Sequence, residues 1–344
     1  MSGDFVRRFG LSESRTEILL RARFGNLKEF FAPARAEAAA LVDAAGFVWS
    51  DEILNRDRDL FRSLGSLDKV IEHHANEHKR TGLNPGRVRE HLSADPHFLL
   101  LMEIAGTGGE TDFDDDFIPL LRTAPFRNLQ TRLNKVYYCK HVHKIWSSNR
   151  GLLLRLEDID PVTLAVLHTA NDCHWTPKPA CPAGRFLIEC SNSPVGTISL
   201  NGGTAKEKGI ARYQKVILPT LFGVIRNWDD YRRHHGLGWW EMIMFKEDVT
   251  GAFNQLYWSV RSAKFLCAMV DENVVFIMLT GGFGHCVTPM IWSLVGEAIV
   301  RKGRQSAFCP IDIFVDDTVG AGSIHDVLVT HTEVQKVDTR FLYH

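Results

Sequence analysis

The most informative stretch of the chain is Ile311-Asp312-Ile313-Phe314-Val315-Asp316-Asp317-Thr318-Val319-Gly320. An apolar run leads into two adjacent carboxylates, and a second short apolar run follows them. This pattern predicts a β-hairpin that presents Asp316 and Asp317 at its tip. Adjacent like charges repel, which favours a bound cation at such a turn, and carboxylate oxygens suit Mg²⁺ or Mn²⁺. The stretch alone leaves a metal site and a solvated turn open.

The composition of the 344 residues is that of a folded protein. Hydrophobic residues make up 45%, which allows a sizeable core, and the length allows two domains or one domain with an extension. The formal net charge of −1 argues against a strongly basic protein that coats nucleic acid, although a basic groove on a neutral body is compatible with it. The seven cysteines include no C-x-x-C pair, so neither a disulfide framework nor a zinc site is indicated.

The two ends of the chain and its apolar runs bear on where the protein acts. The N-terminus is not followed by the apolar core of a signal peptide. The longest apolar runs are too short to span a bilayer. We therefore expect an intracellular protein, cytoplasmic or nuclear, that has no membrane partner.

Residues 1–150 are predicted to be mostly helical, with no role that the residues define. Periodicity and capping residues predict helices over 34–45, 51–67, 67–79, 86–106 and 115–124. His74 and His78 are four residues apart, but a polar helix face is favoured over a metal site because spacing marks no third ligand. The acidic run 110–116 lacks the glycine and the terminal glutamate of a calcium loop, so a solvated loop is favoured.

Residues 151–344 are predicted to combine strands with helices. A strand or short helix is expected at 151–156, and strands are expected at 186–190, 239–246, 274–279 and 308–315. Helices are expected at 216–236, 251–265, 284–303 and 324–338. This order indicates an α+β fold in which helices pack on a small sheet.

A third carboxylate is placed to join the hairpin. Asp248 lies where the strand around Lys246 ends, so it can meet the hairpin tip of a neighbouring strand. Carboxylates from two strands are what a two-metal site for displacement at phosphorus requires. Between them lies Gly282–Trp292, a loop whose glycines let a backbone or a base pair approach closely before a helix begins.

Three motifs in this order resemble those of the reverse transcriptases, the RNA-directed DNA polymerases of retroelements. The first motif is Asp248 followed by Ala252-Phe253, and the third is Phe314-Val315-Asp316-Asp317. The second is Phe283-Gly284 followed by Thr288-Pro289 and Trp292. The separations, 36 residues from Asp248 to Gly284 and 32 from Gly284 to Asp316, suit that family. Each motif alone is a weak signal, and the specificity lies in the three together.

The resemblance implies a right-hand polymerase, with fingers and a partial palm over 151–344 and an antiparallel palm sheet covered by helices. Asp248, Asp316 and Asp317 would be the catalytic ligands of two Mg²⁺ ions, with Mn²⁺ as the alternative. Phe253 would press against the sugar and leave no room for a 2′-hydroxyl, while Phe283 and Gly284 would line the site of the nascent base pair. The implied partners are an RNA or DNA template with its primer, and deoxynucleoside triphosphates.

The resemblance also reaches upstream and covers about residues 165–325. Arg185 and Lys178 would be the basic pair of a fingers hairpin that contacts the triphosphate; ordinary surface cations are the alternative. Phe314 departs from the more usual tyrosine. The chain ends 27 residues after Asp317, so no thumb fits.

Three readings of the resemblance follow. We expect a C-terminally truncated reverse transcriptase of a retrotransposon polyprotein, with residues 1–150 as a lead-in. A catalytically inactive, nucleic-acid-binding remnant of such a polyprotein is the alternative. An RNA-templated RNA polymerase is disfavoured, because Phe253 stands where that enzyme would need room for the 2′-hydroxyl.

Overall fold

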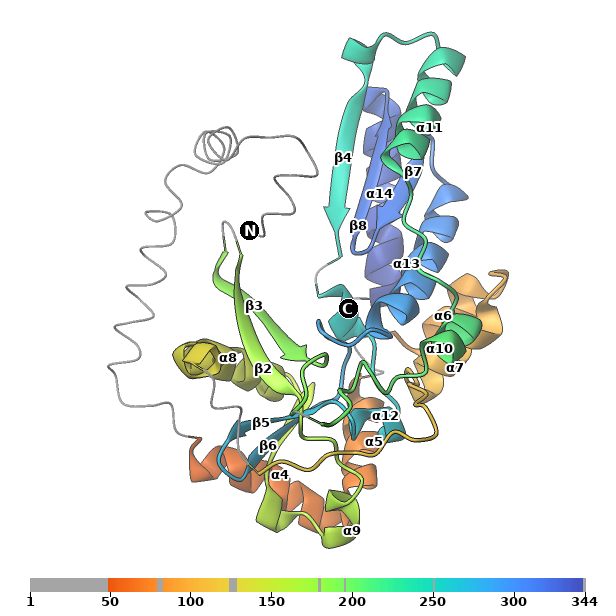
Figure 1. The fold of residues 1–344 in the computed structure, drawn as a ribbon. Helices are drawn as coiled ribbons and strands as arrows, with labels where there is room; N and C mark the ends of the chain where they lie inside the picture. Colours follow the sequence, from red (N-terminus) through yellow and green to blue (C-terminus); the bar gives the residue numbers. More distant parts are fainter. Residues whose placement is uncertain are drawn as a thin grey trace, which may run out of the picture.

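A computed structural model describes residues 49–78, 83–123, 129–178, 181–194, 196–249 and 251–342. Within these ranges the chain is a mixed α/β structure whose strands form small antiparallel sheets. One three-stranded sheet, ordered β4-β8-β7, lies at one end of the molecule, and another, ordered β1-β6-β5, lies toward the opposite end (Figure 1). The expected α+β class is confirmed at this level, but the single small sheet is replaced by two sheets and a separate hairpin, β2–β3.

Helices make up most of the described chain before residue 150, as expected. They are α4 (Asp51–Leu64), α5 (Leu67–His78), α6 (Pro85–Leu92), α7 (Phe98–Thr107) and α8 (Leu129–Ser147). The Ser50 side chain caps α4, which ends at Gly65 with φ +80°. The helix expected over 86–106 is two helices, because Pro96 has no N–H to donate and disfavours helical geometry at the residue before it. The helix expected over 34–45 lies outside the described residues.

The helix expected over 115–124 does not form at 115–123, the part of it that the structure describes. Residues 117–122 form neither helix nor strand, and the backbones of Leu120 and Arg122 bond with a distant segment. Leu120 N–H donates to His168 Nδ1 at 3.2 Å, and Leu120 C=O accepts from the Thr169 amide at 3.0 Å. Pro119 has no N–H to donate and would clash inside such a helix, so the segment bonds with residues 168–169 instead.

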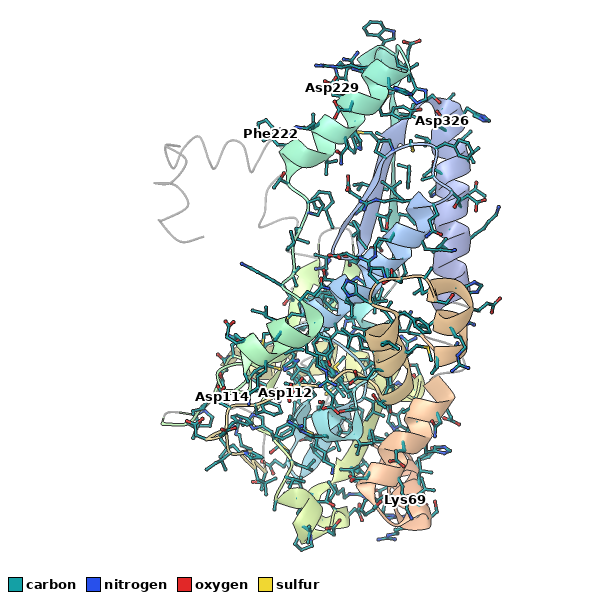
Figure 2. The ribbon with its side chains drawn as sticks, turned by 90° about the vertical axis from the view of Figure 1, so that its right-hand side faces the viewer. Lys69, Asp112, Asp114, Phe222, Asp229 and Asp326 are labelled. Atoms are coloured by element: carbon teal, nitrogen blue, oxygen red, sulfur yellow. The ribbon has the colours of Figure 1, made fainter. Side chains whose placement is uncertain are left out.

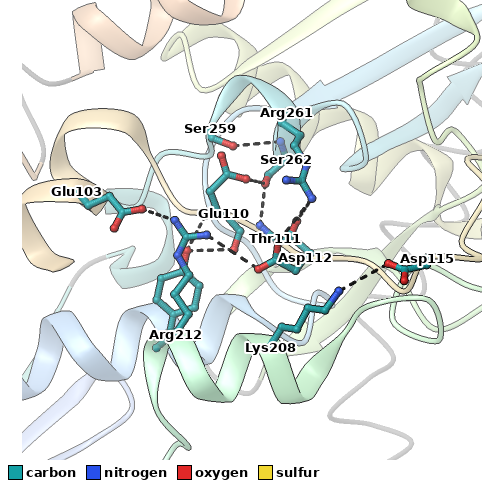
Figure 3. A network of polar contacts seen from close by, with 11 residues as sticks. Glu103, Glu110, Thr111, Asp112, Asp115, Lys208, Arg212, Ser259, Arg261 and Ser262 are labelled. Carbon is teal, nitrogen blue, oxygen red and sulfur yellow. Dashed lines mark hydrogen bonds and ion pairs between the residues drawn. The ribbon is translucent and has the colours of Figure 1, made fainter.

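The first residues of the acidic run 110–116 are held by cations and hydroxyl groups (Figure 3), whereas Asp114, Asp115 and Asp116 are exposed, as expected of a solvated loop. Asp112 lies 3.6 Å from Arg261 and 4.0 Å from Arg212, and Arg212 also pairs with Glu103. Thr111 N–H donates to Ser262 Oγ at 2.8 Å, and that hydroxyl donates to Glu110 at 3.1 Å. The run therefore joins α10 (Lys206–Tyr213) to α12 (Val260–Ala263).

The sheet β1-β6-β5 forms the centre of the core, and we call it the core sheet. Its strands are β1 (Gly151–Arg155), β6 (Val274–Met278) and β5 (Cys267–Asp271), and β6 is buried along its whole length. Asp57 of α4 is buried beside it and accepts from Leu153 N–H at 2.7 Å and from Trp146 Nε1 at 2.9 Å. Burial raises the pKa of Asp57. One hydrophobic cluster runs from Trp49 to Val337, without a break at residue 150.

The helix expected over 251–265 is two short turns of helix around an extended segment. These are η3 (Ala252–Gln255) and α12, and between them Trp258 N–H donates to Leu279 C=O at 2.9 Å. Ser259 Oγ caps α12 by accepting from Ser262 N–H at 3.2 Å. The extended segment thereby aligns with the end of β6. The strand β5, which was not expected, follows this segment in the chain.

The hairpin β2–β3 stands between the two sheets and extends the expected strand 186–190 toward the N-terminus. β2 (Asp172–Lys178) pairs with β3 (Cys181–Glu189), so that Trp175 faces Phe186. On one side the hairpin packs against α8 and β5. On the other it reaches the loop that precedes α13, described below.

The sheet β4-β8-β7 carries the sequence motifs, and we call it the carboxylate sheet. Its strands are β4 (Ile243–Asp248), β8 (Asp317–Gly322) and β7 (Ile311–Phe314), with α13 (Thr288–Arg304) and α14 (Ile324–Leu342) packed against it. α11 (Leu221–His234) contacts β8, and its Tyr231 hydroxyl donates to Asp326 of α14. Phe222, which is 85% exposed, projects from α11 away from the sheet (Figure 2). Apart from the helix expected over 251–265, the helices and strands expected after residue 215 match the observed elements to within about five residues, and β5 was not expected.

The short elements complete the described chain: η1 (Leu156–Asp158), α9 (Pro161–Leu164) and η2 (Trp239–Glu241). None of the helices in the described ranges combines the length and apolarity that crossing a bilayer requires.

Candidate metal centre

The antiparallel register of the carboxylate sheet brings three carboxylates to one edge. β4 and β8 pair with Asp248 opposite Asp317, and β7 and β8 pair with Phe314 opposite Asp317. Val315 and Asp316 are therefore the two residues of the hairpin loop. A carboxylate oxygen from each of Asp248, Asp316 and Asp317 lies within 4.8 Å of the others, and this is the only such cluster among the described residues. The strand alternation and the hairpin predicted from sequence account for this convergence.

The hairpin loop has a costly backbone conformation. Val315 has φ +59°, and a β-branched residue rarely adopts this left-handed region. Two hydrogen bonds hold the loop in place: Trp292 Nε1 of α13 donates to Val315 C=O at 2.6 Å, and Val249 N–H donates to Asp316 C=O at 2.9 Å. The long helix after the glycine loop thus fixes the position of the carboxylates.

Three carboxylates and one lysine interact at this edge of the sheet. Asp316 is half-buried, and its pKa is raised first by burial and then by repulsion from Asp317 and Asp248. Lys246 lies two residues before Asp248 on the same face of β4, and its Nζ is 2.7 Å from Asp317 Oδ2. That hydrogen bond, with the attraction of the three carboxylates, raises the pKa of Lys246. The lysine is therefore a counter-ion within the cluster.

Two aromatic rings pack together, and an arginine links them to the carboxylates. Phe253 is 8% exposed, and its ring contacts that of Phe283 edge-on at 5.0 Å between centroids. Arg185 of β3 lies 5.3 Å from the Phe283 ring, and its positive charge lowers the pKa of Asp316 against the larger effects that raise it. Four sequence-predicted residues, Arg185, Phe253, Phe283 and Asp316, therefore belong to one neighbourhood.

Gly284 lies against the hairpin β2–β3. Its φ is +110°, and a Cβ added there would stand 1.7 Å from Ile188 C=O. The Phe283 carbonyl accepts from Ile188 N–H at 3.2 Å. The glycine was expected to line a base pair, and its close approach in the structure is to the backbone of β3. Lys178 pairs with Cys181 at the far end of the same hairpin, and its side chain lies outside the described part.

Other metal candidates do not form a ligand set. His74 is buried, neither of its ring nitrogens makes a hydrogen bond, and burial lowers its pKa to about 4. The His78 side chain lies outside the described residues. The favoured interpretation, without a metal, therefore stays a prediction for this pair.

Sequence reasoning missed two residues that matter for this site. Lys246 was visible in principle, because residues i and i+2 of a strand share a face. Asn201 lies in a loop-rich stretch with no periodicity, and no local pattern marks it. Its contacts, given below, come only from the fold.

Comparison with known proteins adds no assignment: no protein-family model matches the chain, and no curated protein matches it. The chemistry must be argued from the residues. Three carboxylates with hard oxygen donors fit a divalent cation, and their repulsion is what such a cation would relieve.

Proposed function

We propose that the chain is the fingers and palm of an RNA-directed DNA polymerase of retroelement type. The observation that carries the proposal is the register of β4 with β8, which supports the joint use of Asp248, Asp316 and Asp317. These are the carboxylates of the first and third motifs, and the second motif supplies Trp292, which holds their hairpin. An acidic cluster formed by chance would not be expected to draw on residues of all three motifs.

The reaction would join a primer 3′-hydroxyl to the α-phosphorus of a deoxynucleoside triphosphate, with pyrophosphate leaving. Asp248, Asp316 and Asp317 would hold Mg²⁺ or Mn²⁺. When bound, these ions would supply charge stabilisation and a more acidic hydroxyl. Arg185 would bind the triphosphate through its guanidinium. Phe253 would close the space beside the sugar C2′, so that the predicted product is DNA.

Primer extension on an RNA template with Mg²⁺ tests the proposal. We expect wild-type protein to incorporate deoxynucleotides and Asp248→Asn and Asp316→Asn to incorporate none while keeping the fold. Asp115→Asn is the control, because Asp115 is a fully exposed carboxylate outside the cluster. Incorporation by either cluster variant at the wild-type rate would refute the assignment.

The sugar-selection role of Phe253 needs a conservative variant. Phe253 belongs to the core, and its truncation to alanine would cost about 3–5 kcal/mol of stability. Phe253→Val keeps part of the ring volume and opens the space beside it. We expect this variant to accept ribonucleotides, and continued rejection of them would remove Phe253 from this role.

A second candidate function is nucleic-acid binding without catalysis, as in an inactive retroelement remnant. The ion pair between Lys246 and Asp317 favours it, because the lysine already neutralises a carboxylate that a metal would need. This function predicts template–primer binding that is unchanged by Mg²⁺ and by Asp316→Asn. Mg²⁺-dependent incorporation in the same assay would exclude it.

A further inference from the structure

Asn201 connects two segments that flank the candidate site. It lies in the loop between β3 and α10, and its backbone N–H donates to Cys190 C=O at 2.8 Å, just after β3 ends. Its side-chain amide donates to Gly284 C=O at 2.7 Å and to Ser191 Oγ at 2.9 Å. Its side-chain oxygen accepts from Cys286 N–H at 2.9 Å. One carboxamide therefore satisfies a donor and an acceptor of the loop before α13 while its own backbone is held by the end of β3.

The two segments carry Arg185, whose charge acts on Asp316, and Phe283, whose ring contacts Arg185. β3 carries Arg185, and the loop 281–287 carries Phe283. They also touch directly, through the bond from Ile188 N–H to Phe283 C=O and through the close packing of Gly284 on Ile188. A shift of the loop relative to β3 would therefore move Phe283 with respect to both Arg185 and Phe253.

We propose that Asn201 is a positioning residue that locks the hairpin β2–β3 to the loop 281–287 and so sets Phe283 against Arg185, the cation that acts on Asp316. The proposal rests on the proposed polymerase function for its consequence in nucleotide binding, but the lock itself does not. Only a carboxamide of this length supplies both bonds to the loop. An aspartate could accept from Cys286 N–H but would place a carboxylate against the Gly284 carbonyl.

Asn171 provides a matched control. Its side-chain amide donates to Phe265 C=O and Cys267 C=O, both at 2.9 Å, and it is 2% exposed. It anchors the base of the same hairpin to the core sheet and makes no contact with the loop 281–287 that the structure records. Asn171→Ala therefore removes comparable hydrogen bonds at a distance from the candidate site.

Amide hydrogen exchange tests the lock without any activity. The informative amide is that of Ile188, because it bonds to Phe283 and does not touch Asn201. In Asn201→Ala we expect exchange at Ile188 and Cys286 to be about three- to tenfold faster, the factor for lost hydrogen bonds of ordinary strength. At Ile188, Asn201→Asp should behave like Asn201→Ala, and Asn171→Ala should leave both amides unchanged. Wild-type exchange at Ile188 in Asn201→Ala would overturn the lock.

Nucleotide kinetics test the positioning. We expect Asn201→Ala to raise the KM for dATP about tenfold and to change kcat less, whereas Asn171→Ala keeps the wild-type KM. Equal KM values for the two variants would reduce Asn201 to a purely structural residue and overturn the positioning role. If wild-type protein incorporates no nucleotide, the proposed function and the positioning role both fail, and the exchange at Ile188 still decides whether the lock exists.

Discussion

Removing the charge of Asp316 should stabilise the protein when no metal is present. Two unit charges 4.8 Å apart, the outer separation within the cluster, repel by about 0.9 kcal/mol in water and by about 3.5 kcal/mol at an effective dielectric constant of 20. Because Asp248 is exposed and Lys246 partly neutralises the cluster, the lower figure is the better guide. We expect Asp316→Asn to raise the free energy of unfolding by about 1 kcal/mol at pH 7 in EDTA.

The pH dependence of this stability difference follows from the raised pKa of Asp316. The folded state holds its proton more tightly than the unfolded state does, so the unfolded carboxyl ionises first as pH rises. The stability that this group contributes is therefore present below its ordinary pKa and is lost as pH rises through the folded pKa. The advantage of Asp316→Asn over the wild type should accordingly shrink toward pH 4.

Metal should reverse the order of the two proteins. A ligand that binds only the folded state adds about 2.7 kcal/mol at one hundred times its Kd. With an unfolding entropy of about 2.1 cal/mol/K per residue, this raises the Tm of a 344-residue chain by about 4 °C. We expect Mn²⁺ or Mg²⁺ to produce this rise in wild-type protein and in Asp115→Asn, and to produce little in Asp316→Asn.

Differential scanning fluorimetry and urea unfolding measure both effects, in EDTA and across a metal titration. The reasoning is refuted if Asp316→Asn is no more stable than the wild type in EDTA. It is also refuted if metal stabilises Asp316→Asn as much as the wild type, because the cluster would then not be the site of binding.

Two other predictions concern the surroundings of the cluster. Gly284→Ala should lower the free energy of unfolding by at least about 3 kcal/mol in urea titrations, because the new Cβ would meet Ile188 C=O and the backbone has a positive φ; a loss below 1 kcal/mol would contradict the contact with β3. Lowering the pH from 7.5 to 5.5 should reduce the free energy of unfolding by about 4 kcal/mol. Burial lowers the pKa of His74, His168 and His285 from 6.5 to about 3–4. These histidines therefore take up protons in the unfolded chain before they do so in the folded protein, and the folded protein loses stability as the pH falls. Urea unfolding at a series of pH values measures this loss. A free energy of unfolding that does not change between pH 7.5 and 5.5 would contradict the lowered pKa values of these histidines.

The hairpin and the helices around it could be predicted because their signals are local. The apolar run Ile311–Val315, interrupted only by Asp312, marks a strand, and the adjacent aspartates mark its turn. α13 and α14 were predicted because both are long and amphipathic. The meeting of Asp248 with the hairpin followed from placing it at a strand end, and it required only that the two strands pair in register.

The division into two sheets could not be predicted in the same way. β1 pairs with β6 across more than one hundred residues, and no local pattern specifies that partner. The same holds for the partners of residues 117–122 and 256–259, whose backbones bond with segments distant in the sequence. Asn201 belongs to this class as well, since its four partners come from two separate segments.

Several costs to stability coincide at the hairpin loop. Val315 is held in a left-handed conformation, Asp316 has a raised pKa, and three carboxylates share one edge of the sheet. Such costs persist only where the surroundings enforce them, and here Trp292, Val249 and the pairing of β8 do so. A solvated turn could relieve the costs cheaply, because a glycine at Val315 or an asparagine at Asp316 would remove two of them. The concentration of strain and charge at one loop therefore supports, independently of the motifs, the proposal that these carboxylates bind a cation.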